Sequence, residues 1–208
     1  MRKLMVTTFV SLDGVMQAPG GPDEDREGGF EHGGWAAPHF DDRLLQLMAE
    51  VIGRAEALLL GRRTYDIFAA SWPLTEPDDP FGAKLNGMRK YVASRHLESA
   101  SWQNTTVLTG DLADAVRRLK QGDGGEIQVH GSSELIQTLL RHQLIDEFQV
   151  VVFPVVIGSG KRLFAEGTVP TGLDLLSTTT SGTGVVVQSY ARGNGVAYGA
   201  LGPETGNW

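Results

Sequence analysis

The chain has 208 residues, a formal net charge of −7 and no cysteine. Its 27 glycines are nearly twice the usual share of ~7%, which predicts many tight turns. The acidic balance excludes the basic surface of a nucleic-acid-binding protein, and no apolar run reaches the ~20 residues of a membrane span. Without cysteine there is no disulfide, thiolate nucleophile or cysteine-based zinc site.

The N-terminal apolar stretch is short, contains two threonines and lacks a small-residue cleavage site. It therefore does not fit a signal peptide, and we expect a cytoplasmic protein with no membrane or nucleic-acid partner. The five histidines are scattered along the chain, so we expect no metal site.

Segments of two periodicities alternate along the sequence. A β-branched stretch at residues 3–10 predicts a buried strand. Apolar residues at helical spacing predict a helix over 41–53, with Asp41 as its N-cap. Residues 18–38 between them are rich in glycine and acidic residues, which predicts a loop. The other strands are expected at 57–60, 90–94, 105–109, 126–130, 147–152, 173–180 and 184–191, and the other helices near 62–72, 111–119 and 132–140.

This alternation predicts an α/β fold with a mostly parallel central sheet flanked by helices. The last two strands follow each other without a helix, which predicts antiparallel strands at the C-terminal end. No repeat or linker divides the chain, so residues 1–208 are expected to form a single domain.

Common cofactor and hydrolase motifs are missing. The chain contains no G-x-G-x-x-G, no G-x-S-x-G and no H-E-x-x-H sequence. Gly160-Lys161 has the form of a P-loop ending, but Arg162 stands where a Ser or Thr would hold magnesium.

Three strand-to-helix junctions, at 60–64, 93–95 and 129–133, carry glycine or basic residues. In a parallel sheet, ligands bind beyond the carboxyl ends of the strands, where helix N-termini offer free N–H groups. Each junction alone is better explained as a turn with a capped helix and surface arginines. Three of them in an acidic protein favour an extended polyanionic cofactor.

Five segments in order resemble the dihydrofolate-reductase-like superfamily: SLDG at 11–14, LGRRTY at 60–65, VASR at 92–95, HGSSEL at 130–135 and PVVIGSGKRLF at 154–164. Within it, the chain looks most similar to the C-terminal reductase domain of the bifunctional riboflavin-biosynthesis deaminase-reductase. The resemblance extends to about residue 192 and implies a single dihydrofolate-reductase-like domain with NADPH as its cofactor.

The resemblance also implies which residues hold NADPH. Those expected at the pyrophosphate are Gly61, Arg62, Arg63, Thr64, Gly131, Ser132 and Ser133. Those expected at the adenosine 2′-phosphate are Ser94 and Arg95, and those near the nicotinamide are Thr8, Phe9 and Val15. The superfamily has a second glycine at the later turn, and this chain departs from that pattern with Ser132.

The catalytic group is a carboxylate if the resemblance holds. Dihydrofolate reductases use an acid on the first helix to assist protonation, and direct counting back from Gly61 reaches Leu45, which is not an acid. A shift of one turn reaches Asp41 or Asp42, and Asp13 lies beside the expected nicotinamide. The alternative is that these acids have structural roles. Asp41 would only cap the helix, Asp42 would interact favourably with the helix dipole in the first turn, and Asp13 would form a turn.

Substrate contacts are expected from Lys161 and Arg162, which could bind an anionic group or lie in a surface loop. Residues 18–38 occupy the position of the superfamily's mobile active-site loop, with Trp35 as an anchor and substrate contact. A passive surface loop is the alternative.

These features imply an NADPH-dependent reductase of a small nitrogen heterocycle. The most specific version is reduction of a ribosylamino-pyrimidine phosphate, as by 5-amino-6-(5-phosphoribosylamino)uracil reductase of riboflavin biosynthesis. A dihydrofolate reductase, another small-molecule reductase, and an NADPH-binding protein without turnover are alternatives. The strands at 150–152 and 185–187 are too apolar for a free sheet edge, which favours a homodimer.

Overall fold

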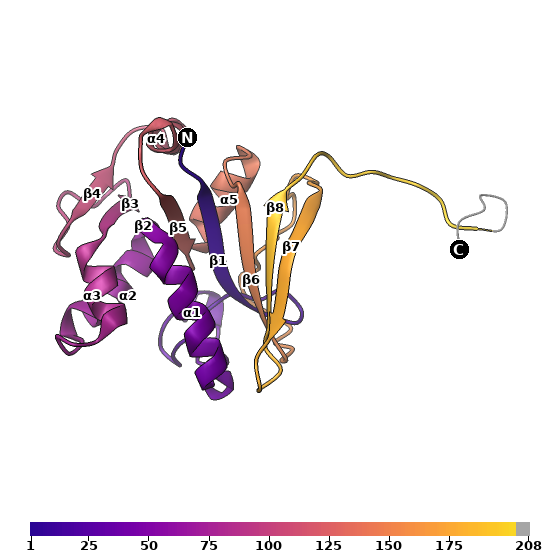
Figure 1. The fold of residues 1–208 in the computed structure, drawn as a ribbon, viewed down its shortest axis with the longest axis horizontal. Helices are drawn as coiled ribbons and strands as arrows, with labels where there is room; N and C mark the ends of the chain where they lie inside the picture. The colour runs from indigo at the N-terminus through magenta and orange to yellow at the C-terminus, as the bar shows by residue number, and fades with distance from the viewer. Residues whose placement is uncertain (203–208) are drawn as a thin grey trace.

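The computed structural model describes residues 1–202. Its strands form one eight-stranded sheet in the order β4-β3-β2-β5-β1-β6-β8-β7, drawn in Figure 1. The strands are β1 (Leu4–Ser11), β2 (Ala55–Gly61), β3 (Arg89–Ala93), β4 (Thr105–Leu108), β5 (Glu126–His130), β6 (Glu147–Phe153), β7 (Leu173–Thr180) and β8 (Val186–Arg192). The fold class expected from the alternation of elements is confirmed.

The helices follow the strands as expected, with one addition. They are α1 (Asp42–Arg54), α2 (Arg62–Ser71), α3 (Pro80–Gly87), α4 (Leu112–Gln121) and α5 (Ser133–Arg141), with short 3-10 turns at 27–29, 37–39 and 72–74. Helix α3 was not expected, because only Gly82 and Leu85 are buried along it and it lacks an amphipathic stripe. Pro80 at its first turn and Asp79, whose carboxylate accepts from the Phe81 N–H, start it.

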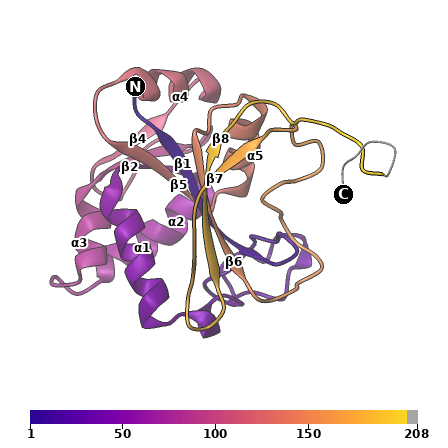
Figure 2. The same cartoon turned by 45° about the vertical axis from the view of Figure 1, so that its right-hand side comes forward.

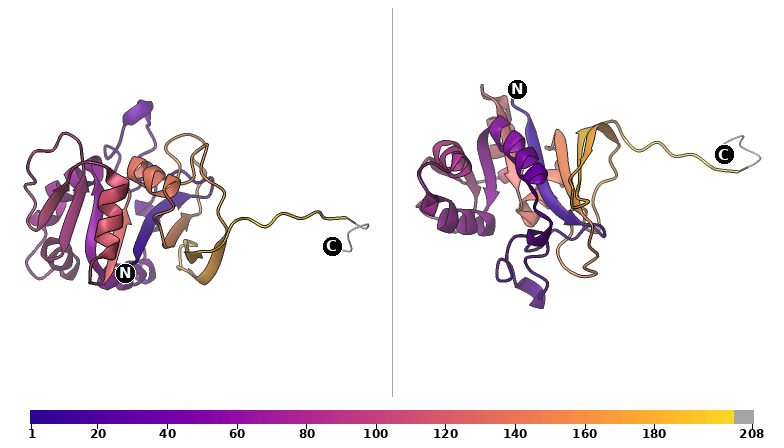
Figure 3. Two further views of the ribbon diagram at one scale, coloured as in Figure 1. Left: turned by 90° about the horizontal axis from the view of Figure 1, so that it is seen from above. Right: turned by 60° about the horizontal axis from the view of Figure 1, so that its bottom comes forward.

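The helices cover the two faces of the sheet (Figures 2 and 3). Helices α4 and α5 pack with Leu4, Val6 and Ile127 on one face. On the other face, α1 packs against β6 and β8, while α2 and α3 pack against β2 and β3. Helices α1, α4 and α5 thus bury their apolar stripes against strands that are covered on both faces.

Strands β1 to β6 are parallel to one another. Their carboxyl ends therefore meet at one edge of the sheet, and the loops after β1, β2, β3, β4 and β5 gather there. The adjacency of β2 and β5 in particular brings the turn after Gly61 beside the turn after His130.

The C-terminal strands form the expected antiparallel pair, and β8 also pairs antiparallel with β6. Strand β8 separates β6 from the edge, so Val151 and Val187 are buried within this chain. The valine-rich strands were expected to lie at a sheet edge covered by a second chain, but they lie inside the sheet; the edge strand at this end is β7, which exposes Leu175 and Leu176. In residues 1–202, no helix is long and apolar enough to cross a membrane.

Candidate active site

A cavity of about 1950 Å³ opens along the carboxyl ends of the parallel strands. Its walls come from the turns that follow β1 to β5, from one face of α1 and from the loop after β1. Ligand pockets usually measure ~300–1,000 Å³, so this space is large enough for a nucleotide and a small substrate together.

The two helices that begin deepest in this cavity have no side-chain cap. Helices α1, α3 and α4 are capped by the carboxylates of Asp41, Asp79 and Asp111. Within the described chain, the N-termini of α2 and α5 have no such hydrogen bond. Their first N–H groups are therefore free to bind an anion, as at other phosphate-binding helix starts.

The turn before α5 is shaped by two residues with positive φ. Gly131 has φ +51°, and a side chain there would meet the Thr64 hydroxyl at 3.2 Å. Ser132 has φ +60° and ψ +50°, a left-handed conformation that costs roughly 1–2 kcal/mol for a residue with a side chain.

The hydrogen bonds of Ser132 offset this cost. Its hydroxyl accepts from the Gly61 N–H at 2.9 Å and donates to the His130 carbonyl at 2.9 Å. Its N–H donates to the Thr64 hydroxyl at 3.0 Å. Ser132, which stands where the superfamily has its second glycine, thus joins the turn before α2 to the turn before α5.

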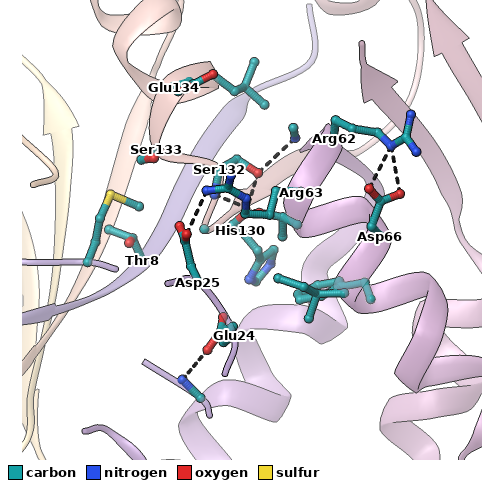
Figure 4. A pocket seen from close by; sticks show the side chains of 18 of the residues that line it. Thr8, Glu24, Asp25, Arg62, Arg63, Asp66, His130, Ser132, Ser133 and Glu134 are labelled. Atoms are coloured by element: carbon teal, nitrogen blue, oxygen red, sulfur yellow. Dashed lines mark hydrogen bonds and ion pairs between the residues drawn. The ribbon is translucent and has the colours of Figure 1, made fainter. Parts of the chain in front are cut away.

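The two arginines after Gly61 are already paired. Arg62 binds Asp66 one helical turn later at 2.8 Å. The Arg63 guanidinium donates to Asp25 at 2.8 Å and to Glu27 at 2.6 Å, as Figure 4 shows for Asp25. The 18–38 loop therefore places two carboxylates beside the start of α2.

Lys161 completes this ion cluster, which consists of Asp25, Glu27, Arg63 and Lys161. Its ammonium group is 2.6 Å from Asp25 and also donates to Glu27. Hydrogen bonds from Lys161 and Arg63 lower the pKa of Glu27. Burial opposes ionisation of Asp25, but bonds from Lys161 and its other donors outweigh it and lower the pKa of that carboxyl.

The turn after β3 lies at the far end of the cavity. The Ser94 hydroxyl accepts from the backbone N–H groups of His96 and Leu97. Arg95 is exposed, lines the cavity and forms no ion pair with any described residue. It is a free cation at the site's edge.

Asp13 and Arg162 lie outside the residues that line the cavity. The Asp13 carboxylate accepts from the Ser11 hydroxyl at 2.6 Å and from the Ile157 and Gly158 N–H groups, and these bonds lower its pKa strongly. Arg162 donates to the Asp13 carbonyl and to Gly158. The two residues join the loop after β1 to the loop after β6, and an ionised Asp13 has no proton to donate.

Asp41 and Asp42 are likewise absent from the cavity wall. Asp41 caps α1 by accepting from the Leu44 N–H at 2.7 Å, which lowers its pKa, and its other oxygen accepts from Thr183 in the β7–β8 turn. Asp42 is exposed on the first turn. Leu45, the position reached by direct counting, does line the cavity and is apolar.

Val15 and Trp35 are also buried away from the cavity. Val15 is fully buried and bridges to Arg162. The Trp35 indole is 9% exposed, donates to the Gln17 carbonyl at 2.8 Å and packs edge-on to Phe153. It anchors the 18–38 loop rather than facing a substrate, whereas residues 18–25 of that loop do line the cavity.

The other expected binding residues all line the one cavity: Thr8, Phe9, Gly61, Arg62, Arg63, Thr64, Ser94, Arg95, Gly131, Ser132, Ser133 and Lys161. Within residues 1–202, no three His, Cys, Asp or Glu side chains are grouped so as to hold a metal ion.

Thr7 and His130 are among the polar wall residues that the sequence did not indicate as site residues. Burial lowers the pKa of His130 to about 4, so its ring is neutral at pH 7. The Thr7 hydroxyl is buried and has no hydrogen-bond partner within the described chain. Thr7 is the fourth residue of β1 and His130 is the last residue of β5, and no local pattern distinguishes them from the other polar residues of these strands.

Residues 2–187 match the family model of the RibD C-terminal domain. Two uncharacterized proteins of Bacillus subtilis (strain 168) are similar over nearly their whole lengths. YyaP is 26% identical over 91% of this chain and 94% of its own length. YwjB is 28% identical over 92% of this chain and 98% of its own length.

Solved structures show the same fold. A candidate riboflavin biosynthesis protein of Shewanella sp. PV-4 superposes with a TM-score of 0.65 at 20% identity, covering 92% of this chain and 99% of that one. A deaminase/5-amino-6-(5-phosphoribosylamino)uracil reductase of Thermotoga maritima gives 0.60 at 16% identity, covering 92% of this chain and 56% of that one.

Proposed function

Because this chain belongs to the RibD C-terminal domain family, we propose that it is an NADPH-dependent reductase of a small pyrimidine-type heterocycle. The observation that carries the proposal is the pair of uncapped helix N-termini, α2 and α5, joined by Ser132 at the wall of a cavity large enough for nucleotide and substrate. Two such helix starts side by side suit a pyrophosphate.

The residues of the cavity fit NADPH along its length. The backbone N–H groups in the first turns of α2, from Arg62 to Thr64, and of α5, from Ser133, would hold the pyrophosphate. Arg95 would bind the 2′-phosphate, because its guanidinium is unpaired and lies at the end of β3. When bound, NADPH supplies the hydride, and the protein positions the two reactants and excludes water.

The proton has a different source from that in dihydrofolate reductases. The α1 residues at the cavity are Leu45, Met48, Val51 and Ile52, all apolar. Asp13 and Asp41 are held ionised by hydrogen bonds. We therefore propose that neither α1, Asp13 nor Asp41 supplies the proton.

The name of the Thermotoga maritima relative includes a uracil reductase, and a ribosylamino-pyrimidine phosphate is the most specific substrate that we propose. Its phosphate would require a cation, and Lys161 is the lysine at the cavity wall. Binding there would displace Asp25 or Glu27 from the ion cluster.

The test has two readouts. We expect NADPH to raise the melting temperature, since a ligand at ~100 times its Kd adds about 2.7 kcal/mol. We also expect NADPH oxidation, followed at 340 nm, with a ribosylamino-pyrimidine phosphate and not with dihydrofolate. Stabilisation by NADPH without NADPH oxidation in the presence of any pyrimidine would instead indicate a nucleotide-binding protein without turnover, and no stabilisation would refute the proposal.

A further inference from the structure

Two neutral polar side chains lie side by side on the floor of the cavity. Thr7 and His130 are register partners in the parallel pair β1–β5. Both side chains point to the face covered by α1, because Val6 and Val129 next to them belong to the core on the opposite face. Both residues line the cavity, and Figure 4 shows the His130 ring below the Ser132 turn.

Hydrogen bonds define which ring nitrogen of His130 carries the proton. The Gln128 amide group donates both of its hydrogens, one to the Val51 carbonyl at 2.8 Å and one to Glu126. Its oxygen must then accept from His130 Nε2, which lies 3.0 Å away. His130 is therefore protonated at Nε2 and presents the lone pair of Nδ1 as an acceptor.

Thr7 supplies the complementary group. Its side chain is 2% exposed, and its hydroxyl has no hydrogen-bond partner within residues 1–202. A buried hydroxyl without a partner is unfavourable, and native structures rarely keep one without a reason. A ligand with an acceptor at this point would satisfy it.

The part of the cavity beside Thr7 and His130, here called the chamber, is otherwise lined by apolar side chains. Leu45, Met48 and Val51 of α1 and Phe9 of β1 line the cavity on this face. A charged group placed among them would lose its hydration without gaining an ionic partner. The chamber therefore suits a flat, uncharged ring with one hydrogen-bonding edge.

We propose that Thr7 and His130 recognise a lactam edge of the substrate ring, with a ring N–H donating to His130 Nδ1 and the adjacent carbonyl accepting from the Thr7 hydroxyl. This rests on the proposed function and specifies the substrate as a neutral cyclic amide. The two residues position the ring and take no part in proton transfer.

The test uses 6-aminouracil, which has the lactam edge, and 6-amino-1,3-dimethyluracil, which lacks the ring N–H groups. Their Kd values are measured by ligand-observed NMR on the full chain, with and without NADPH. We expect 6-aminouracil to bind at least ~5-fold more tightly, since one net hydrogen bond contributes about 1 kcal/mol. Comparable binding of both compounds, or no binding of 6-aminouracil, would overturn the proposal.

Variants assign the effect to the pair. Thr7→Val and His130→Phe should each weaken 6-aminouracil binding ~5-fold or more. Thr179→Val, a half-buried strand threonine on β7 away from the cavity, should leave binding unchanged. Thr7→Val should keep or raise the melting temperature, because it removes an unpaired buried hydroxyl. If His130→Phe fails to fold, the Thr7→Val variant alone tests the proposal. Wild-type affinity for 6-aminouracil in Thr7→Val would contradict it.

The two proposals fail in different ways. If NADPH does not bind while Thr7→Val still weakens 6-aminouracil binding, the reductase proposal is wrong and the role of the pair holds. If NADPH binds and is oxidised while Thr7→Val leaves 6-aminouracil affinity unchanged, the role of the pair is wrong and the reductase proposal holds.

Discussion

Charged side chains at the carboxyl edge of the sheet differ in what they already bind. Arg62, Arg63 and Lys161 are paired with acids of this chain, whereas Arg95 is unpaired within the described residues and exposed. An unpaired guanidinium can bind a phosphate without first losing a partner, so Arg95 is the residue at which cofactor choice should be measurable.

We predict that Arg95→Ala removes a preference for NADPH over NADH. A charge-assisted hydrogen bond contributes about 1.5–3 kcal/mol, so NADPH affinity should fall roughly 10- to 100-fold while NADH affinity changes little. Fluorescence titration at fixed ionic strength measures both. Arg117→Ala is the control, since Arg117 pairs with Asp114 on α4 and does not line the cavity. Equal Kd values for the two nucleotides in the parent protein would contradict the prediction.

Asp41 and Asp42 should matter little for hydride transfer. Asn caps a helix as well as Asp, so Asp41→Asn and Asp42→Asn should keep the single-turnover rate within about twofold, against the ~10²–10⁴-fold loss typical of a missing general acid. Rapid-mixing absorbance at 340 nm tests this. A loss of a hundredfold in either variant would restore the carboxylate mechanism.

Asp13 should instead affect stability in a pH-dependent way. Because its pKa is lowered in the folded chain, its stabilising effect is present above the ordinary Asp pKa of ~3.9 and declines as the pH falls toward the folded value. Asp13→Asn should therefore lower the melting temperature at pH 7 and lower it less at pH 3. A constant difference at both pH values would count against this role.

At the scale of elements, the ion cluster of Asp25, Glu27, Arg63 and Lys161 connects three segments: the 18–38 loop, the start of α2 and the loop after β6. Phe30 and Trp35, nearer the C-terminal end of the same loop, are buried. The loop is therefore held across the cavity by charges at one end and by packing at the other. Its mobility stays a prediction.

We predict that Asp25→Asn combined with Glu27→Gln frees this end of the loop. Hydrogen exchange of residues 20–29 should become faster, and NADPH affinity should rise by up to ~5-fold, because exposed ion pairs contribute about 0–1 kcal/mol and Arg63 no longer has a competing partner. Asp23→Asn is the matched control, since Asp23 pairs only with the neighbouring, exposed Arg26. Unchanged exchange in the double variant would show that packing alone holds the loop.

At the scale of the whole molecule, the sheet face opposite α1 is incompletely covered. Val150, Val152 and Tyr190 on β6 and β8 are only partly buried there, and Leu175 on β7 is register partner to Tyr190 and 56% exposed. An exposed apolar edge strand is a site for association, so we propose that a second copy of this chain covers it.

Light scattering at micromolar concentration should then give twice the 22.4 kDa of one chain. Leu175→Glu should yield the monomer mass, because it places a charge in the proposed interface. Leu74→Glu should not, since Leu74 is exposed in the turn between α2 and α3, away from β7. A monomer mass for the parent protein would refute the homodimer.

Local patterns in the sequence were sufficient for most of the fold. The helix at 42–54 and the strand at 126–130 follow from apolar spacing and flanking caps, which act over a few residues. The three glycine and arginine junctions were also recognisable, because parallel strands place their carboxyl ends together whatever lies between them.

Only the tertiary structure decided which side chains meet at the cavity. Arg63 pairs with Asp25, Asp13 joins two loops through hydrogen bonds, and the apolar Leu45 lines the cavity. Each of these contacts depends on segments that are far apart in the sequence. Thr7 and His130 become neighbours through the register of β1 on β5. Register and loop packing depend on the free energy of the whole folded chain, and a local sequence pattern does not contain that information.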